Sequence, residues 1–180
     1  VTEKDEYIYH EMITHIPMAT NPNIKKVLVI GAGDGGTVRE LCRYPSIEQI
    51  DMVEIDELVV HLAKEYLPFT ACSLDDQRVH IYYQDGLRFV RKVENEYDLI
   101  IVDSTDPFGV GEGLFTKEGV DRGRHTGQPA REHILHVLFQ CHETGTQPHQ
   151  RVLPDCTGVS GSYPHLSLRT LALWICFEKV

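Results

Sequence analysis

The first two thirds of the chain alternates short runs of β-branched residues with stretches that are apolar at helical spacing. Near the start, apolar side chains recur every three to four positions between Ile8 and Ile16, which predicts a helix over residues 5–19. Pro17 and the Asn-Pro-Asn at residues 21–23 predict the end of that helix.

Strand and helix patterns then follow one another in a regular order. Residues 25–44 contain an apolar run, a glycine turn and an amphipathic helix, and residues 49–67 contain a second strand and helix. Residues 78–93 repeat this order with a shorter helix. Residues 97–104 (YDLIIVDS) form a fourth strand that is apolar enough to be buried on both faces. The pattern predicts an α/β fold with a doubly wound parallel sheet.

Composition places the chain among soluble, acidic, single-domain proteins. It has 180 residues, 42% of them apolar, and a formal net charge of −10. Such a surface argues against nucleic acid and membrane partners, because both need clustered Lys and Arg. The charge is uneven: residues 1–118 hold 22 acidic and 11 basic residues, whereas residues 119–180 hold 5 and 6.

The cysteines and the absence of targeting signals predict a cytoplasmic protein. Five cysteines are widely spaced without a CxxC pair, which is typical of a reduced compartment rather than a disulfide framework. No apolar run reaches the length of a membrane span, and the N-terminal segment lacks the pattern of a signal peptide. The spacings His133-x-x-His136 and Cys141-His142 match no zinc module, so we expect no metal site.

Acidic residues follow the predicted strands. They are Asp34 in the glycine turn, Glu54, Asp85, Asp103 and Asp106. In an open parallel sheet the ligand crevice lies outside the carboxyl ends of the strands, so we expect these carboxylates to converge. A pocket lined by carboxylates favours a small cationic ligand.

The glycine turn and the second strand together indicate a nucleoside site. The turn from Gly31 to Gly36 leaves backbone amides of residues such as Gly33 open to a ligand, but Asp34 within it would repel a pyrophosphate. Glu54 stands about 20 residues further on, where an acid accepts hydrogen bonds from ribose hydroxyls. A nucleoside without phosphates fits this pattern.

Two further acidic positions have both a binding and a structural interpretation. Asp85, followed by Gly86, could accept a hydrogen bond from an exocyclic amine such as that of adenine, or could cap the helix that follows. Asp103 and Asp106 are three residues apart on one loop and could hold an ammonium group between them, although an ordinary turn also uses Asp, Ser and Pro.

The motifs DEYIYHEM, VLVIGAGDGGTVRE, VEID, YYQDG, DLIIVDSTDP and GEGLFTKE, in this order, resemble the spermidine synthases. These are aminopropyltransferases that use decarboxylated S-adenosylmethionine as co-substrate, and the resemblance covers residues 1–118. It implies a Rossmann-like fold of the S-adenosylmethionine methyltransferase type, putrescine as the amine substrate, no permanently bound cofactor and a homo-oligomer. A putrescine N-methyltransferase and a non-catalytic fragment are the alternatives.

The resemblance also implies a role for each motif residue. Glu54 holds the ribose, Asp85 and Gly86 meet the adenine, and Asp103 is the catalytic proton acceptor. The amine site comprises Tyr9, His10, Asp34 and the loop Asp103, Ser104, Thr105 and Asp106. By its local sequence alone His10 would be an ordinary structural histidine, and only the resemblance places it in the site.

The chain departs from the family pattern in three places. It begins too late to include the family's N-terminal β-domain, and Val110 stands where the family has proline. The sequence of residues 119–180 does not resemble the helix and strand that follow in the family. We therefore expect an aberrant tail that lacks the later strands of the family's sheet. If the codons for residues 163–179 are read in a frame shifted by one base, they can encode TPTYPSGHWLFGFASKK, which resembles a family motif. In the same shifted frame the codons for residues 127–132 can encode VNQHES. A reading-frame shift is the predicted cause.

Overall fold

The computed structural model describes residues 2–93, 96–104, 135–143, 157–162 and 169–177. Its elements up to residue 103 are α1 Glu6–Thr20, β1 Lys26–Gly31, α2 Gly36–Cys42, β2 Gln49–Glu54, α3 Glu57–Tyr66, α4 Pro68–Ala71, β3 Val79–Tyr83, α5 Gly86–Val90 and β4 Leu99–Asp103. Three strands follow, β5 Leu135–Glu143, β6 Thr157–Ser162 and β7 Arg169–Phe177. Apart from the short α4, the elements before residue 104 occur where the pattern predicts them.

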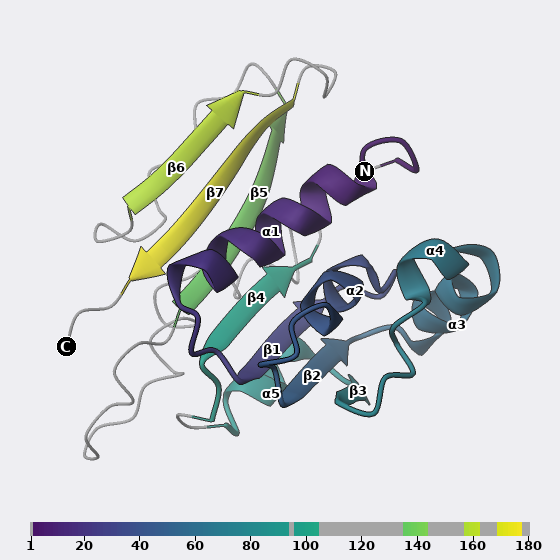
Figure 1. Ribbon diagram of the computed structural model, residues 1–180. Helices are drawn as coiled ribbons and strands as arrows, with labels where there is room; N and C mark the ends of the chain where they lie inside the picture. Colours follow the sequence, from purple (N-terminus) through teal and green to yellow (C-terminus); the bar gives the residue numbers. More distant parts are fainter. Residues whose placement is uncertain (1, 94–95, 105–134, 144–156, 163–168, 178–180) are drawn as a thin grey trace.

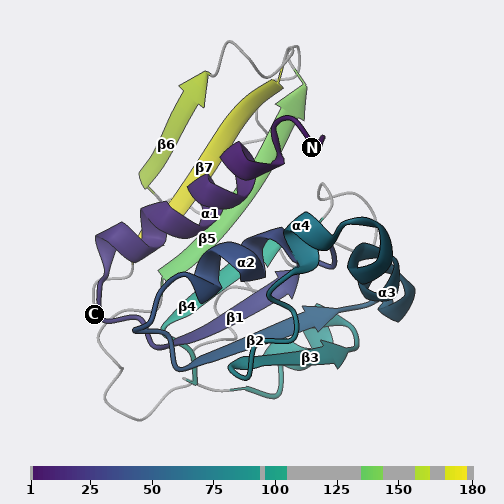
Figure 2. The same cartoon turned by 45° about the vertical axis from the view of Figure 1, so that its right-hand side comes forward.

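All described strands belong to one sheet, in the order β3-β2-β1-β4-β5-β7-β6 (Figures 1 and 2). The pairs β2/β3, β1/β2, β1/β4 and β4/β5 are parallel, whereas β7 runs antiparallel to β5 and β6. The parallel, doubly wound α/β prediction is therefore confirmed for the first part of the chain. The order reverses at β1, so the carboxyl ends of β1 and β4 meet where such sheets bind ligands.

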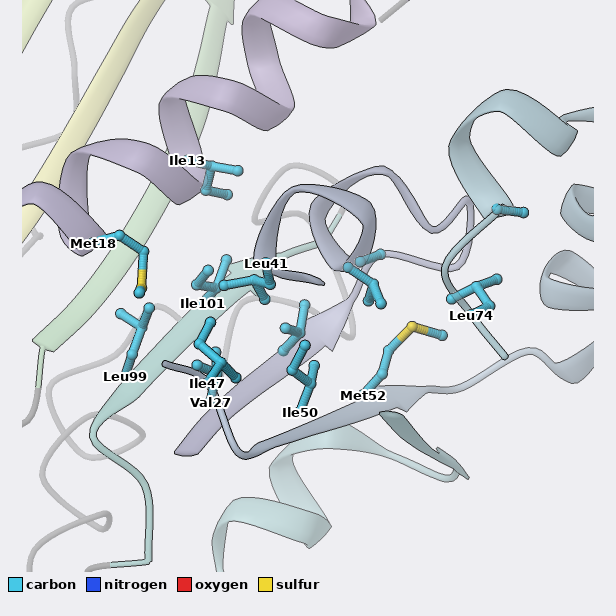
Figure 3. Packing of buried hydrophobic residues seen from close by; sticks show 14 of the residues in the cluster. Ile13, Met18, Val27, Leu41, Ile47, Ile50, Met52, Leu74, Leu99 and Ile101 are labelled. Carbon is cyan, nitrogen blue, oxygen red and sulfur yellow. The ribbon is translucent and has the colours of Figure 1, made fainter. Parts of the chain in front are cut away.

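Alternating residues of the central strands enter two separate cores. On one face, Val27 and Val29 of β1 pack with residues of α1, α2 and α3, among them Ile13, Leu41 and Val60. Figure 3 shows side chains of α1 and α2 meeting those of the strands. On the other face, the intervening strand residues Leu28, Ile30, Ile100 and Val102 pack with Phe89 and Val90 of α5. β4 also contributes Leu99 and Ile101 to the first core, so the predicted burial of the strand at residues 97–104 on both faces is confirmed.

The first helix ends where the sequence predicts, just before the Asn-Pro-Asn at residues 21–23. α1 runs through Pro17 to Thr20, where the Asn21 N–H donates to the Pro17 carbonyl at 3.0 Å. Proline removes one helical hydrogen bond, a local cost. Ile13, Pro17 and Met18 are all buried, so packing of the last turn against the sheet outweighs that cost.

The tail also differs from expectation. Residues 119–180 were expected to lack the later strands, yet β5 pairs in parallel with β4 and β7 pairs with β5. Without β5, the open edge of β4 would leave its backbone donors and acceptors unpaired. The segments LHVLFQCHE and RTLALWICF are rich in residues that favour strands, which accounts for their pairing there. The frame shift itself stays a prediction.

Candidate functional site: a carboxylate cluster at the ends of β1, β2 and β4

Asp103, the last residue of β4, lies between two hydroxyl groups. The Tyr9 hydroxyl of α1 donates to its Oδ1 at 2.5 Å, and the Thr37 hydroxyl of α2 donates to its Oδ2 at 2.6 Å. Hydroxyl donors from two helices therefore fix the orientation of the carboxylate. Each oxygen retains acceptor capacity for a ligand proton, since a carboxylate offers about four lone-pair positions.

Burial raises the pKa of the Asp103 carboxyl, and the neighbouring charge of Asp34 acts in the same direction. The hydrogen bonds from Thr37 and Tyr9 and the charge of His10 oppose this rise without cancelling it. A carboxylate whose pKa lies above its ordinary range is a stronger base, so Asp103 is suited to accept a proton.

His10 links α1 to the glycine turn. Its ring is 2% exposed, with Nδ1 2.7 Å from Glu6 Oε2 and Nε2 3.4 Å from Asp34 Oδ2. The ring lies directly against Gly36, where an added Cβ would come within 2.2 Å of it. The absence of a side chain at Gly36 is what allows His10 to occupy this place.

The Glu6 carboxylate is held in turn by Arg39 of α2. The two guanidinium nitrogens Nη1 and Nη2 donate to Glu6 Oε1 and Oε2 at 3.2 and 3.1 Å. Arg39 Nε also donates to Glu40 at 2.9 Å, and Nη1 donates to the Phe69 carbonyl at 3.1 Å. A forked arginine contact of this kind fixes both the position and the charge of its carboxylate.

The His10–Asp34 contact shifts the pKa of both groups. Burial alone would lower the pKa of His10, but the contact with Asp34, the charge of Asp103 and the contact with Glu6 outweigh it and raise that pKa. Burial alone would raise the pKa of Asp34, but the contact with His10 and the Gly36 N–H lower it. A protonated His10 facing an ionised Asp34 is therefore favoured.

The glycine turn brings the backbones of β1 and β4 together. Gly31 pairs with Asp103, and the Ala32 N–H donates to the Asp103 carbonyl at 2.9 Å. Gly31 has a φ of +89°, and a Cβ there would lie 2.0 Å from that carbonyl oxygen. Glycine is required at this position both by its backbone conformation and by the close approach.

The predicted nucleoside residues lie at the ends of β2 and β3. Glu54 ends β2, and its Oε1 accepts from the Asp56 N–H at 3.1 Å. Its Oε2 lies beside Gly33, 2.9 Å from where a Cβ would be. The structure thus brings Glu54 next to the glycine turn, and its contact with ribose stays a prediction.

Asp85 caps the helix that follows it, as one of its two interpretations predicts. Its Oδ1 accepts from the backbone N–H groups of Leu87 and Arg88 at 2.8 and 3.2 Å, at the N-terminus of α5, which begins at Gly86. The contact of Asp85 and Gly86 with adenine stays a prediction. Ser104 directly follows β4, whereas Thr105, Asp106 and Val110 lie outside the described residues.

Two groups of side chains among the described residues have ligand atoms close enough to hold a cation. His10, Asp34 and Asp103 have theirs within 4.8 Å of one another, as do Glu11, His15 and Glu40. In the second group Arg43 already contacts Glu40 at 2.5 Å. In the first, two carboxylates and a histidine offer acceptors that suit an ammonium group as well as a metal ion.

The sequence did not point to Glu6, Thr37 or Arg39 as site residues. Glu6 is four residues before His10, a spacing at which helical side chains meet. The predicted helix therefore carried enough information to predict the Glu6–His10 contact. Thr37 and Arg39 act on residues 66 and 33 positions away, and no local pattern signals such contacts.

Comparison with known proteins identifies the family. Residues 6–125 match the spermine/spermidine synthase domain. This chain belongs to the spermine/spermidine synthase family. Two of its relatives are polyamine aminopropyltransferases. The one from Alkaliphilus oremlandii is 81% identical over 118 residues, which are 66% of this chain and 42% of that protein. The one from Lachnoclostridium phytofermentans is 66% identical over 169 residues, covering 79% of this chain and 60% of that protein.

Solved structures of the family have the same fold. A spermidine synthase in complex with the transition-state analogue AdoDATO matches with a TM-score of 0.81 and 36% identity, over 98% of this chain and 62% of that one. The spermidine synthase of Thermotoga maritima matches with a TM-score of 0.76 and 34% identity, over 98% and 61%. A protein from Escherichia coli assigned as a methyltransferase, 15% identical with a TM-score of 0.63, shares the fold alone.

This family member spans less than two thirds of the length of those relatives. Among its described residues, none of the helices has the length and apolar character needed to cross a membrane. The Rossmann-like, methyltransferase-type fold expected from the sequence is confirmed by these structural neighbours.

Proposed function

We propose that the protein transfers an aminopropyl group from decarboxylated S-adenosylmethionine to putrescine, giving spermidine and methylthioadenosine in polyamine biosynthesis. The observation that carries this proposal is the convergence of Tyr9, His10, Asp34 and Asp103 beside the glycine turn of β1. Membership of the spermine/spermidine synthase family and the spermidine synthase complex with AdoDATO support it.

The donor nucleoside lies across the carboxyl ends of β1, β2 and β3 in this proposal. Glu54 accepts hydrogen bonds from the ribose hydroxyls, and the amides near Gly31 and Gly33 face the donor. Asp85 and Gly86 meet the adenine. The geometry of Glu54 supports this role, because the hydrogen bond from the Asp56 N–H goes to Oε1 and no N–H of the described residues donates to Oε2.

The acceptor amine lies at the carboxyl end of β4. One ammonium group of putrescine contacts Asp34, His10 and Tyr9, and the loop of Ser104, Thr105 and Asp106 continues the site. The attacking amine lies at Asp103. The two amino groups of putrescine thereby lie at the carboxylates of Asp34 and Asp103. The negative charges of these carboxylates offset the cost of removing water from the cationic amines.

The reaction is a displacement at the methylene carbon beside the donor sulfonium. The amine nitrogen forms a bond with this carbon while the C–S bond breaks, and the electron pair of that bond neutralises the sulfonium to give the thioether methylthioadenosine. Asp103 accepts the proton that the amine must lose to use its lone pair. The raised pKa of Asp103 makes this transfer more favourable than it would be for an exposed aspartate.

An assay that separates the nucleoside products tests this proposal. Protein is incubated with putrescine and either decarboxylated S-adenosylmethionine or S-adenosylmethionine, and products are measured by chromatography and mass spectrometry. Methylthioadenosine with spermidine is expected. Adenosylhomocysteine would instead indicate the N-methyltransferase. Thermal stabilisation by methylthioadenosine without turnover would indicate a fragment that only binds the nucleoside.

The tail carries a separate proposal, that residues 119–180 are read in a shifted frame. It is supported by the change in charge after residue 118. It is also supported by the family-like sequences that the shifted frame can encode at residues 127–132 and 163–179. Sequencing source DNA across the codons for Lys117 to Gly127 tests it. A missing or extra base is expected, whereas an unchanged frame would show that the tail is genuine.

A further inference from the structure

A largely buried ion pair between Glu6 and Arg39 lies directly behind the proposed amine site, and the transfer reaction does not use it. Glu6 is 8% exposed, its carboxylate is bound by both Nη atoms of Arg39, and its Oε2 is 2.7 Å from His10 Nδ1. Glu6, His10 and Asp34 thus form a chain in which the imidazole stands between two carboxylates. Desolvating so many charges is costly, so their arrangement calls for an explanation.

The geometry defines which form of the imidazole fits. A neutral histidine has one N–H and one lone pair, so either tautomer would direct a lone pair at a carboxylate oxygen, that of Glu6 or that of Asp34. The doubly protonated ring donates on both sides, from Nδ1 to Glu6 at 2.7 Å and from Nε2 toward Asp34 at 3.4 Å. The free site therefore matches an imidazolium.

We propose that Glu6, clamped by Arg39, is a positioning residue that orients His10 toward Asp34 with a proton on Nε2, and that an entering ammonium group of the diamine takes the place of this proton. This inference rests on the proposed function. The ammonium then donates to Asp34 and to the Nε2 lone pair, while Nδ1–H remains bonded to Glu6. The proton leaves to solvent, and one positive charge replaces another opposite Asp34.

The charges around His10 favour this exchange. Glu6 and the Tyr9 ring, which is nearly perpendicular to the imidazole, face His10 from α1. Asp34 faces it from the turn after β1, and Asp103 acts on it from the end of β4. Arg39 of α2 reaches it only through Glu6, whose charge it balances. The net effect raises the pKa of His10 despite burial, so the free protein holds the proton at pH values where an ordinary histidine loses it.

The direction of the pH effect follows from linkage. Below the pKa of His10 in the free protein, binding of the diamine releases a proton, so affinity weakens by up to about tenfold for each pH unit of further acidification. Above that pKa the ring is already neutral and affinity no longer changes with this group. Loss of the Glu6 charge lowers the pKa and moves this break to lower pH.

The first test follows His10 in the free protein by NMR titration, its signal assigned by its loss in His10→Gln. We expect a pKa above the ordinary histidine value, a lower one in Glu6→Gln, and an intermediate one in Glu6→Asp, which keeps the charge on a shorter side chain. Glu11→Gln is the matched control, because this charge on the same helix faces Arg43 at 4.0 Å instead of His10. An ordinary or lowered pKa, or equal values in the Glu6→Gln and Glu11→Gln variants, would overturn the inference.

The second test counts protons when putrescine binds the wild-type protein, by calorimetry in two buffers with different ionisation enthalpies. Release of close to one proton is expected below the pKa of His10, with none in His10→Gln. Binding without release would overturn the exchange but leave the proposed function intact. Absence of any putrescine binding would overturn both the exchange and the proposed function, while the titration of the free protein would still decide the role of Glu6.

Discussion

The two ends of the proposed site are built in different ways. At the amine end, the side chains of Tyr9 and Thr37 both bond Asp103, across sequence separations of up to 94 residues. At the nucleoside end, the hydrogen bonds of Glu54 and Asp85 within the described part of the chain come from backbone N–H groups two or three residues away. One end is a network between helices and strands, and the other is a pair of local loop contacts.

Because of this difference, substitutions at the two ends should affect different properties of the protein. A substitution in the network removes a partner from several buried groups at once, so it affects stability and chemistry together. A substitution at a locally bonded acid affects chiefly the ligand that the acid would bind. The amine end is thus ordered before the ligand arrives, which favours fast and specific reaction of a correctly placed amine.

Asp103→Asn tests the amine end most severely. The amide keeps the shape but cannot accept the amine proton, so kcat for methylthioadenosine formation should fall by about 10²- to 10⁴-fold. Wild-type kcat should rise with pH through the raised pKa of Asp103, because the base acts when ionised. This acid limb should be absent from the residual activity of Asp103→Asn.

Asp75→Asn is the control for this change, since that carboxyl is 84% exposed and pairs only with Lys64 among the described residues. It should leave kcat unchanged. An Asp103→Asn protein that retains activity within about tenfold of wild type would show that another group accepts the proton.

Glu54→Gln tests the nucleoside end. Loss of charged hydrogen bonds to the ribose should weaken donor binding by about 10- to 100-fold, since such bonds contribute about 1.5–3 kcal/mol. Putrescine affinity and melting temperature should change little, because Glu54 bonds locally, to the Asp56 N–H, among the described residues. Glu57→Gln, 62% exposed on α3, is the matched control. Equal losses of donor and putrescine affinity would contradict the separation of the two ends.

Gly36→Ala and Gly33→Ala compare the two ends by the same chemical change. The new methyl at position 36 meets the His10 ring, so putrescine affinity should fall by about tenfold and stability by about 1–3 kcal/mol. At position 33 it meets the ends of the Val59 and Glu54 side chains, so donor affinity should fall instead. Calorimetric titration and urea unfolding measure both, and matching profiles for the two variants would argue against this assignment.

Asp85→Asn should have the smallest effect. Asparagine caps a helix as well as aspartate does, so unfolding free energy should stay within about 0.5 kcal/mol of wild type. Asp85→Ala loses the bonds to Leu87 and Arg88 and should cost about 1 kcal/mol. If the carboxylate meets adenine, both variants bind methylthioadenosine a few-fold more weakly. Unchanged affinity would leave Asp85 with its capping role alone.

Much of the fold could be predicted because its signals are local. The run VLVI indicates a strand and LIIV a strand buried on both faces without long-range information, and the glycine turn marks the passage from β1 to α2. The acids expected at the strand ends also follow from local pattern plus the rule that parallel strands end at one edge. Asp34, Glu54 and Asp103 were placed in this way.

What the sequence did not reveal depends on contacts between distant segments. Thr37 and Arg39 look like ordinary residues of an amphipathic helix, and only the folded chain brings Asp103 of β4 to Thr37 and Glu6 of α1 to Arg39. The tail strands pair because β4 offers an open edge, which is a property of the folded sheet and not of the tail.

The placement of α1 has a consequence for how the protein is made. Tyr9 and His10 are synthesised early, but Asp103, to which Tyr9 bonds, is added 94 residues later. Until β4 has emerged from the ribosome, the polar face of α1 lacks this partner, and closing so long a loop requires the central strands to be paired first. The carboxylate cluster thus forms only after β4 has been made, so the Tyr9–Asp103 contact would report that synthesis and sheet assembly have both passed β4.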